Sequence, residues 1–140
     1  MGPFTVDASV FLNAFNPQEP RHDESHRLLA HLQAEAIPIV VPTLLLPEVA
    51  GTIARGRQDS VLALEFARAI SRLPHLVLVA LDAALGRRAL AVAAEHRLRG
   101  SDAVYAAVAM QFGSTLVTLD REQRERVAKV VPARWPSEAI

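Results

Sequence analysis

Short apolar runs rich in β-branched residues alternate with longer segments of helical periodicity along this chain. The apolar runs, each expected to form a strand, cover residues 4–6, 37–41, 76–81 and 115–119, with a further short candidate at 127–131. Strands separated by helical crossovers pair in parallel and need helices on both faces of their sheet. The pattern therefore predicts an α/β fold with a parallel sheet of four to five strands.

The segments between these runs carry the start and stop signals of helices. Helices are expected over residues 7–15, 22–35, 42–54, 60–72, 83–98 and 101–112, with a last one after Asp120. Asp82 and Ser101 are suitable N-cap residues, and Gly100 is expected to separate the two helices around it. The tail at 132–136 is expected to be irregular. The sequence contains no internal repeat, no linker and no shift in composition, so residues 1–140 are predicted to form one domain.

Composition limits the classes of function. The 140 residues are 51% hydrophobic and 21% charged, which is ordinary for a globular domain with a real core. No apolar run approaches the roughly 20 residues of a membrane span, and the N-terminus lacks a secretory signal, so we expect a cytoplasmic protein. The absence of cysteine excludes thiolate catalysis and cysteine-based metal sites.

Charge gives a weaker signal. Fifteen basic residues balance fifteen acidic ones, which counts mildly against a nucleic-acid partner. All the basic residues except Lys129 are arginines, which suit bidentate phosphate contacts, although base composition of the gene explains the bias equally well.

Four acidic residues stand where an α/β fold would bring them to one edge of the sheet. Asp7 and Asp120 close the first and fourth expected strands, Glu48 interrupts an apolar helical segment, and Asp102 opens a strongly apolar helix. In open α/β sheets, sites form at the carboxyl ends of the strands.

Each acid alone also has a structural explanation. Asp7, Asp102 and Asp120 lie at helix starts, where a carboxylate caps backbone N–H groups and complements the helix dipole. A salt bridge to arginine would explain Glu48. Together, however, the four carboxylates would repel one another unless cations held them. Mg²⁺ and Mn²⁺ prefer such oxygen ligands, and bound to these acids they would activate water for phosphodiester hydrolysis.

The chain resembles the PIN-domain ribonucleases, especially the toxins of bacterial VapBC-type toxin–antitoxin pairs. The resemblance rests on four segments in order, at 6–9 (Val-Asp-Ala-Ser), 46–50 (Leu-Pro-Glu-Val-Ala), 101–105 (Ser-Asp-Ala-Val-Tyr) and 117–122 (Val-Thr-Leu-Asp-Arg-Glu). It implies a PIN-like three-layer α/β/α fold with sheet order 3-2-1-4-5. The metal-binding and catalytic acids would be Asp7, Glu48, Asp102 and Asp120.

The resemblance further implies an Mg²⁺-dependent endoribonuclease, with Mn²⁺ as a substitute, whose partners are RNA, a cognate antitoxin and a second copy of the chain. The apolar helices at 60–70 and 83–94 could supply a dimer surface or simply pack in the core. Ser9 and Thr118 occupy positions where relatives place hydroxyls near the metal, although local backbone hydrogen bonds explain both.

Other functions stay open at this point. A stand-alone PIN ribonuclease for RNA processing would share all these residues, and an inactive PIN-like module would only bind a partner. A phosphoacceptor receiver would need an acidic neighbour beside Asp7, and a haloacid-dehalogenase-like phosphatase would need aspartate where Ser9 stands.

Several remaining features have plain structural interpretations. His22 and His26 share a helical face but lack a third zinc ligand in a recognisable pattern. Arg97 and Arg99 before Asp102, Arg121 and Arg124 after Asp120, and Arg55 and Arg57 beyond Glu48 are either RNA contacts or solubilising charges. Phe11, Phe15 and Phe66 are expected in the core, and Trp135 is expected to be a packing anchor.

Overall fold

A central sheet of five parallel strands organises the computed structural model, which describes residues 2–140. The strand order is β3-β2-β1-β4-β5, as predicted. The strands are β1 Phe4–Val6, β2 Ile39–Pro42, β3 Leu76–Val79, β4 Thr115–Val117 and β5 Ala133–Arg134. Every neighbouring pair is parallel, with Phe4 of β1 in register with both Ile39 of β2 and Thr115 of β4.

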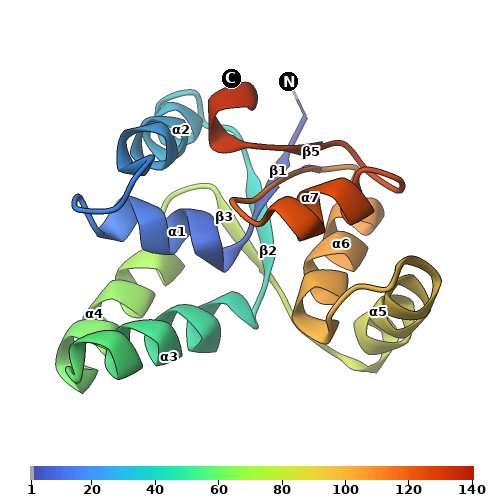
Figure 1. Cartoon of the computed structure of the whole chain (residues 1–140), viewed down its shortest axis with the longest axis horizontal. Helices are drawn as coiled ribbons and strands as arrows, with labels where there is room; N and C mark the ends of the chain where they lie inside the picture. The colour runs from blue at the N-terminus through green and yellow to red at the C-terminus, as the bar shows by residue number, and fades with distance from the viewer. Residues whose placement is uncertain (1) are drawn as a thin grey trace.

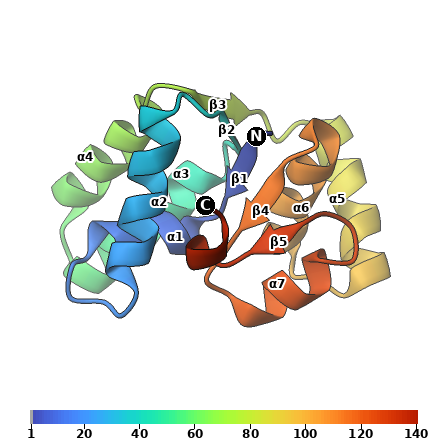
Figure 2. The same ribbon diagram turned by 90° about the horizontal axis from the view of Figure 1, so that it is seen from above.

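Helices cover both faces of this sheet, which confirms the three-layer α/β/α architecture. In Figures 1 and 2, α1 to α4 lie on one side, α5 and α6 lie on the other, and α7 runs beside β5. The helices are α1 Ala8–Phe15, α2 His22–Ala34, α3 Leu45–Arg57, α4 Ser60–Ser71, α5 Ala83–His96, α6 Gly100–Phe112 and α7 Arg121–Val127, followed by the 3-10 helix η1 Pro136–Glu138.

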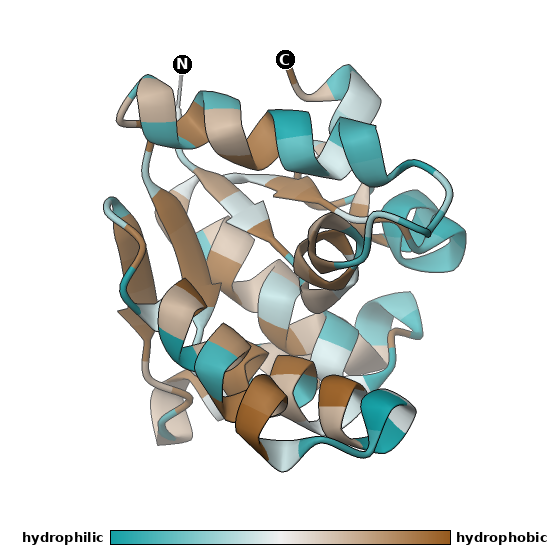
Figure 3. Ribbon diagram, turned by 90° about the vertical axis from the view of Figure 1, so that its left-hand side faces the viewer, coloured by the Kyte–Doolittle hydropathy of each residue, from teal (hydrophilic) through white to brown (hydrophobic). Residues whose placement is uncertain are grey.

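The hydrophobic core lies between the sheet and its helices. Strands β1 and β2 are buried at every position, as strands covered on both faces should be. Helix α6 is buried along seven consecutive residues, and four of these are alanines, whose small side chains let the helix pack closely on the sheet. The outer helices alternate apolar and polar faces, visible as brown and teal bands in Figure 3.

The last strand is not where the sequence pattern placed it. The candidate at 127–131 is wrong, because Val127 is the final residue of α7, with its side chain fully buried, and a turn follows. The segment expected to be irregular instead supplies β5, whose Ala133 is in register with Leu116 of β4. Pro132 lacks an N–H but contributes its carbonyl, which accepts from the N–H of Leu116 at 2.8 Å.

Two helix boundaries also differ from expectation. Pro42 ends β2 instead of starting a helix, and α3 begins at Leu45. The break between α5 and α6 is made by Arg97, whose left-handed backbone (φ 57°) ends α5, while Gly100 is already the first residue of α6. Strand β3 stops at Val79, two residues earlier than expected.

The topology sets the position of the candidate site. Strands β1 and β4 are adjacent and parallel, so their carboxyl ends meet at one edge, and the chain leaves them in opposite directions across the sheet. Such a switch point is where α/β proteins bind their ligands. Asp7 directly follows β1, and Asp120 lies three residues beyond the end of β4. None of the helices among residues 2–140 is long and apolar enough to cross a membrane.

Candidate active site

Asp7 is the most buried of the four acids, with 6% of its surface exposed. Its backbone N–H continues the sheet by donating to the carbonyl of Val117 at 3.1 Å. Its side chain caps α1: Oδ1 accepts from the backbone N–H of Ser9 at 3.0 Å and also from the Ser9 hydroxyl. On the other side, Oδ2 lies 2.7 Å from the hydroxyl of Thr118. Asp7 is therefore both a helix cap and a carboxylate fixed by two hydroxyls.

The two hydroxyls are themselves held by the loop after β4. Ser9 Oγ accepts from the N–H of Leu119 at 3.0 Å, and Thr118 Oγ1 accepts from the N–H of Asp120 at 3.0 Å. Thr118 Oγ1 also lies 2.8 Å from Oε1 of the buried Gln123. Because a hydroxyl has one proton, Thr118 can donate either to Asp7 or to Gln123, and an ionised Asp7 is the stronger acceptor.

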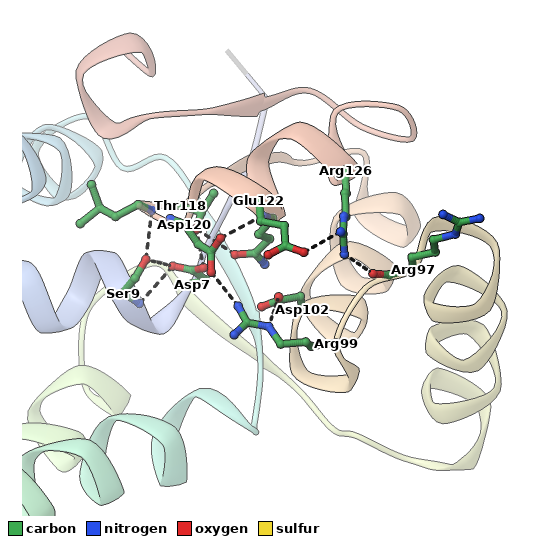
Figure 4. A network of polar contacts seen from close by, with 11 residues as sticks. Asp7, Ser9, Arg97, Arg99, Asp102, Thr118, Asp120, Glu122 and Arg126 are labelled. Atoms are coloured by element: carbon green, nitrogen blue, oxygen red, sulfur yellow. Dashed lines mark hydrogen bonds and ion pairs between the residues drawn. The ribbon is translucent and has the colours of Figure 1, made fainter.

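Arg99 joins the second pair of acids. Its Nε donates to Asp102 Oδ2 at 3.1 Å, and its Nη2 donates to Asp120 Oδ2 at 2.6 Å (Figure 4). Asp102 lies in the first turn of α6, and Asp120 caps α7 by accepting from the N–H of Gln123 at 3.0 Å. The Arg99 side chain is 68% exposed, so it reaches this position from the surface.

Glu48 is held by a partner on α6. It lies in the first turn of α3, and its Oε1 accepts from the Tyr105 hydroxyl at 2.6 Å. Tyr105 is 2% exposed, and burial raises its pKa, so it remains a protonated donor. The partner of Glu48 is thus a tyrosine hydroxyl rather than the arginine considered from sequence.

The four acids are near enough to influence one another's ionisation. The pKa of Asp7 is raised to about 6, chiefly by burial and also by the negative charge of Asp102, against the lowering effect of the Ser9 and Thr118 hydrogen bonds. Burial and the charge of Asp102 also raise the pKa of Glu48. The pKa of Asp102 is raised by burial and by Asp120, against the opposing effect of Arg99. Asp102 is therefore the common neighbour of the other three carboxylates.

The chemical type of these side chains suits a hard divalent cation, because a cation bound by their carboxylate oxygens would relieve their mutual repulsion. As placed, however, no three histidine or acidic side chains within residues 2–140 are gathered closely enough to hold an ion. The guanidinium of Arg99 stands between Asp102 and Asp120 as their counter-cation. A metal ion that bound both aspartates would have to displace it.

The surrounding charges form a separate, more exposed network. Glu122 pairs with Arg126 at 2.6 Å, and Arg126 Nη1 donates to the backbone carbonyl of Arg97, which ties α7 to the turn before α6 (Figure 4). Trp135 packs as expected, with the guanidinium of Arg124 5.0 Å from its ring centroid.

Sequence reasoning missed Tyr105 and the side chain of Gln123. Tyr105 is the only tyrosine of the chain and lies three residues after Asp102, one turn along a helix segment otherwise made of alanine and valine, which is a usable signal. Gln123 lies in the first turn of α7. Its backbone N–H does bond Asp120, but its side chain turns inward to Thr118.

The parallel sheet, with acidic side chains at the switch point between β1 and β4, defines an α/β protein with an acidic site. The chain belongs to the PIN domain family, whose model matches residues 4–129. This membership confirms the family expected from the four sequence segments. No curated protein matches the sequence.

Solved structures with the same fold include toxin–antitoxin proteins. VapC20 from Mycobacterium tuberculosis, a toxin that cleaves the sarcin–ricin loop, aligns with a TM-score of 0.70 and 21% identity over 86% of this chain and 92% of its own. VapBC2 from Rickettsia felis, solved with promoter DNA, gives 0.70 and 13% identity over 94% and 96%. FitAcB from Neisseria gonorrhoeae gives 0.69 and 20% identity over 95% and 97%.

Proposed function

We propose that this protein is a divalent-metal-dependent endoribonuclease and the toxin of a toxin–antitoxin pair. The observation that carries the proposal is the convergence of Asp7, Glu48 and Asp120 around Asp102 at the carboxyl edge of the sheet, with raised pKa values for Asp7, Glu48 and Asp102. A site of mutually repelling carboxylates is suited to Mg²⁺ or Mn²⁺.

The four acids would hold the metal. When bound, the ion would supply Lewis acidity toward a phosphodiester and a lowered pKa for its water. The residues of this chain prepare that site. Ser9 and Thr118 fix both oxygens of Asp7, Tyr105 fixes Glu48, and Arg99 neutralises Asp102 and Asp120 until the ion arrives. Once displaced, the exposed guanidinium of Arg99 is free to contact a substrate phosphate.

RNA is the proposed substrate and an antitoxin the proposed partner. Support comes from membership of the PIN family and from structural neighbours that include an RNA-cleaving toxin and toxin–antitoxin complexes. Because RNA is the proposed substrate, we expect the protein to act in the cytoplasm. The neighbours favour a toxin over a stand-alone processing enzyme.

Exposed apolar side chains support partner binding. Val61 and Leu64 on α4 are 64% and 47% exposed, and Leu90 on α5 is 70% exposed. Exposed apolar side chains close together on one helix can mark an interaction surface, and we propose that α4 and α5 contact the antitoxin and a second copy of the chain.

The test is cleavage of a structured RNA by the purified chain with Mn²⁺ or Mg²⁺, compared with EDTA and with an Asp7→Asn variant. We expect cleavage that disappears in both controls. Cleavage that persists in EDTA would refute the metal-dependent mechanism. Cleavage retained by Asp7→Asn would trace the activity to another site or to a contaminant.

A folded chain that neither binds Mn²⁺ nor cleaves any of several RNAs would instead identify an inactive PIN-like binding module. Isothermal titration with Mn²⁺ separates that outcome from narrow substrate specificity, since a specific ribonuclease still binds its metal.

A further inference from the structure

A second concave feature adjoins the acidic site. A pocket of about 440 Å³ opens between α1 and α3, and we refer to it as the α1–α3 pocket. Ser9 and Leu119 belong to its lining. Ser9 also bonds Asp7, and Leu119 immediately precedes Asp120, so the pocket and the carboxylates share a wall. A ligand in the pocket would therefore lie next to any phosphate at the acids.

Flat stacking groups form part of this pocket. Phe15 and Arg57 both line it, and the guanidinium carbon of Arg57 lies 5.4 Å from the Phe15 ring centroid. Phe15 also makes an edge-to-face contact with Phe66, at 4.6 Å between centroids. Unstacked RNA bases are held on aromatic rings and guanidinium planes of this kind.

Hydrogen-bonding groups in the pocket favour a base over a phosphate. Asn13 lines the pocket and is 4% exposed; its Nδ2 donates to the carbonyl of Pro20 at 2.9 Å, whereas its Oδ1 has no partner among the described residues. A buried acceptor without a partner is costly, and a small shift of the Asn13 side chain toward the pocket would let an N–H group of a base satisfy it directly or through one water. Glu19, also in the lining, would repel a phosphate but accept from a base amino group.

We propose that the α1–α3 pocket binds the base of one unpaired nucleotide of the RNA substrate, adjacent to the phosphate that is cleaved. The base stacks on the guanidinium of Arg57, which itself lies over the Phe15 ring, and the N–H groups of the base face Asn13 and Glu19. The volume lies within the range of small-ligand sites. This inference rests on the proposed ribonuclease function and adds to it a subsite that selects the nucleotide beside the cut.

Gly56 offers a way to fill the pocket without disturbing the fold. It lines the pocket from within α3, and a Cβ added there would meet no atom within 4 Å. Leucine is also a better helix former than glycine. Gly86 on α5 is the matched control, because it too is helical, has nothing within 4 Å of an added Cβ, and lies outside the pocket lining.

The experiment measures binding of a fluorescein-labelled, random-sequence single-stranded RNA in EDTA by anisotropy, and then kcat/KM for whichever RNA the wild type cleaves. We expect Gly56→Leu to weaken binding and lower kcat/KM by roughly tenfold or more, the usual effect of losing one stacked base, and Gly86→Leu to change neither. The Mn²⁺-induced rise in Tm should be the same in all three proteins.

Abasic substitution within the cleaved RNA gives an independent readout. Removing the base beside the cut should weaken wild-type binding but leave Gly56→Leu unaffected. Arg57→Ala should reproduce the loss, with Arg55→Ala on the same helix as its control. If Gly56→Leu no longer showed the Mn²⁺-induced rise in Tm, its effect on RNA binding could reflect damage to the acidic site. The comparison of Arg57→Ala with Arg55→Ala would then test the pocket.

Three results would overturn the proposal. If the wild type cleaved RNA and neither Gly56→Leu nor Arg57→Ala changed RNA binding or kcat/KM, the subsite would be refuted and the proposed ribonuclease function would remain. Unchanged RNA binding with loss of a protein partner would assign the pocket to that partner. A wild-type protein that binds neither RNA nor Mn²⁺ and cleaves none of several RNAs would remove both the subsite and the proposed function.

Discussion

Replacing Asp7 by asparagine should make the metal-free protein more stable. Asp7 is 6% exposed, and burial and Asp102 raise its pKa from 3.8 to about 6. The pKa of Asp7 is higher in the folded state than in the unfolded state, so the protonated carboxyl favours folding. This contribution to stability is complete below about pH 4 and is lost as the pH rises through about 6. At about pH 8 the ionised carboxylate therefore costs the folded state about 3 kcal/mol.

Asparagine removes this cost and can keep the local hydrogen bonds. Its Oδ1 can still accept from Ser9, and its Nδ2 can donate to Thr118 Oγ1. The single hydroxyl proton of Thr118 then becomes available to Gln123, whose Oε1 lies 2.8 Å away. We expect a gain in the free energy of unfolding of about 1–3 kcal/mol at about pH 8 and a much smaller gain at about pH 4.

Urea unfolding in EDTA at both pH values measures the effect. Asp82→Asn is the matched control, since Asp82 caps α5 by accepting from the N–H of Leu85 at 2.9 Å and asparagine caps almost equally well. If Asp7→Asn lost stability at both pH values while the control did not, the charge of Asp7 would be needed for capping and the reasoning from repulsion would be refuted.

Four further measurements test the site. Mn²⁺ at about 100 times its Kd should raise the free energy of unfolding by about 2.7 kcal/mol, and Asp102→Asn should abolish the shift in Tm. The Mn²⁺ affinity, followed by isothermal titration, should fall as the pH is lowered through the Asp7 pKa of about 6, because a protonated carboxyl does not bind metal. Arg99→Ala should tighten Mn²⁺ binding by up to about fivefold, because an exposed ion pair that the metal must break is worth at most about 1 kcal/mol; weaker binding would show that Arg99 assists the metal. Tyr105→Phe should lower the free energy of unfolding by about 1 kcal/mol in urea, because Glu48 loses its buried donor; an unchanged value would mean that water replaces it fully.

The local sequence pattern was sufficient for most of the fold. Four of the five strands follow from short apolar runs separated by helical segments, because both signals are properties of neighbouring residues. The sheet order was expected from the resemblance to the PIN family and not from the local pattern. The fifth strand does not follow from any such signal. Ala133 and Arg134 have no strand pattern of their own, and they pair only because β4 presents an open edge beside them.

The sequence by itself determined which chemistry the site can hold. Cysteine is absent, and the acids after β1 and β4 must lie at one edge, because adjacent parallel strands end together. Tertiary structure alone decided how those acids are held. Arg99 between Asp102 and Asp120, Tyr105 on Glu48 and the Thr118 hydroxyl between Asp7 and Gln123 include contacts that span up to 111 residues. Such pairings depend on side-chain directions that only the packed sheet and helices fix, because no local periodicity encodes which of many arginines, hydroxyls and amides will face a given carboxylate.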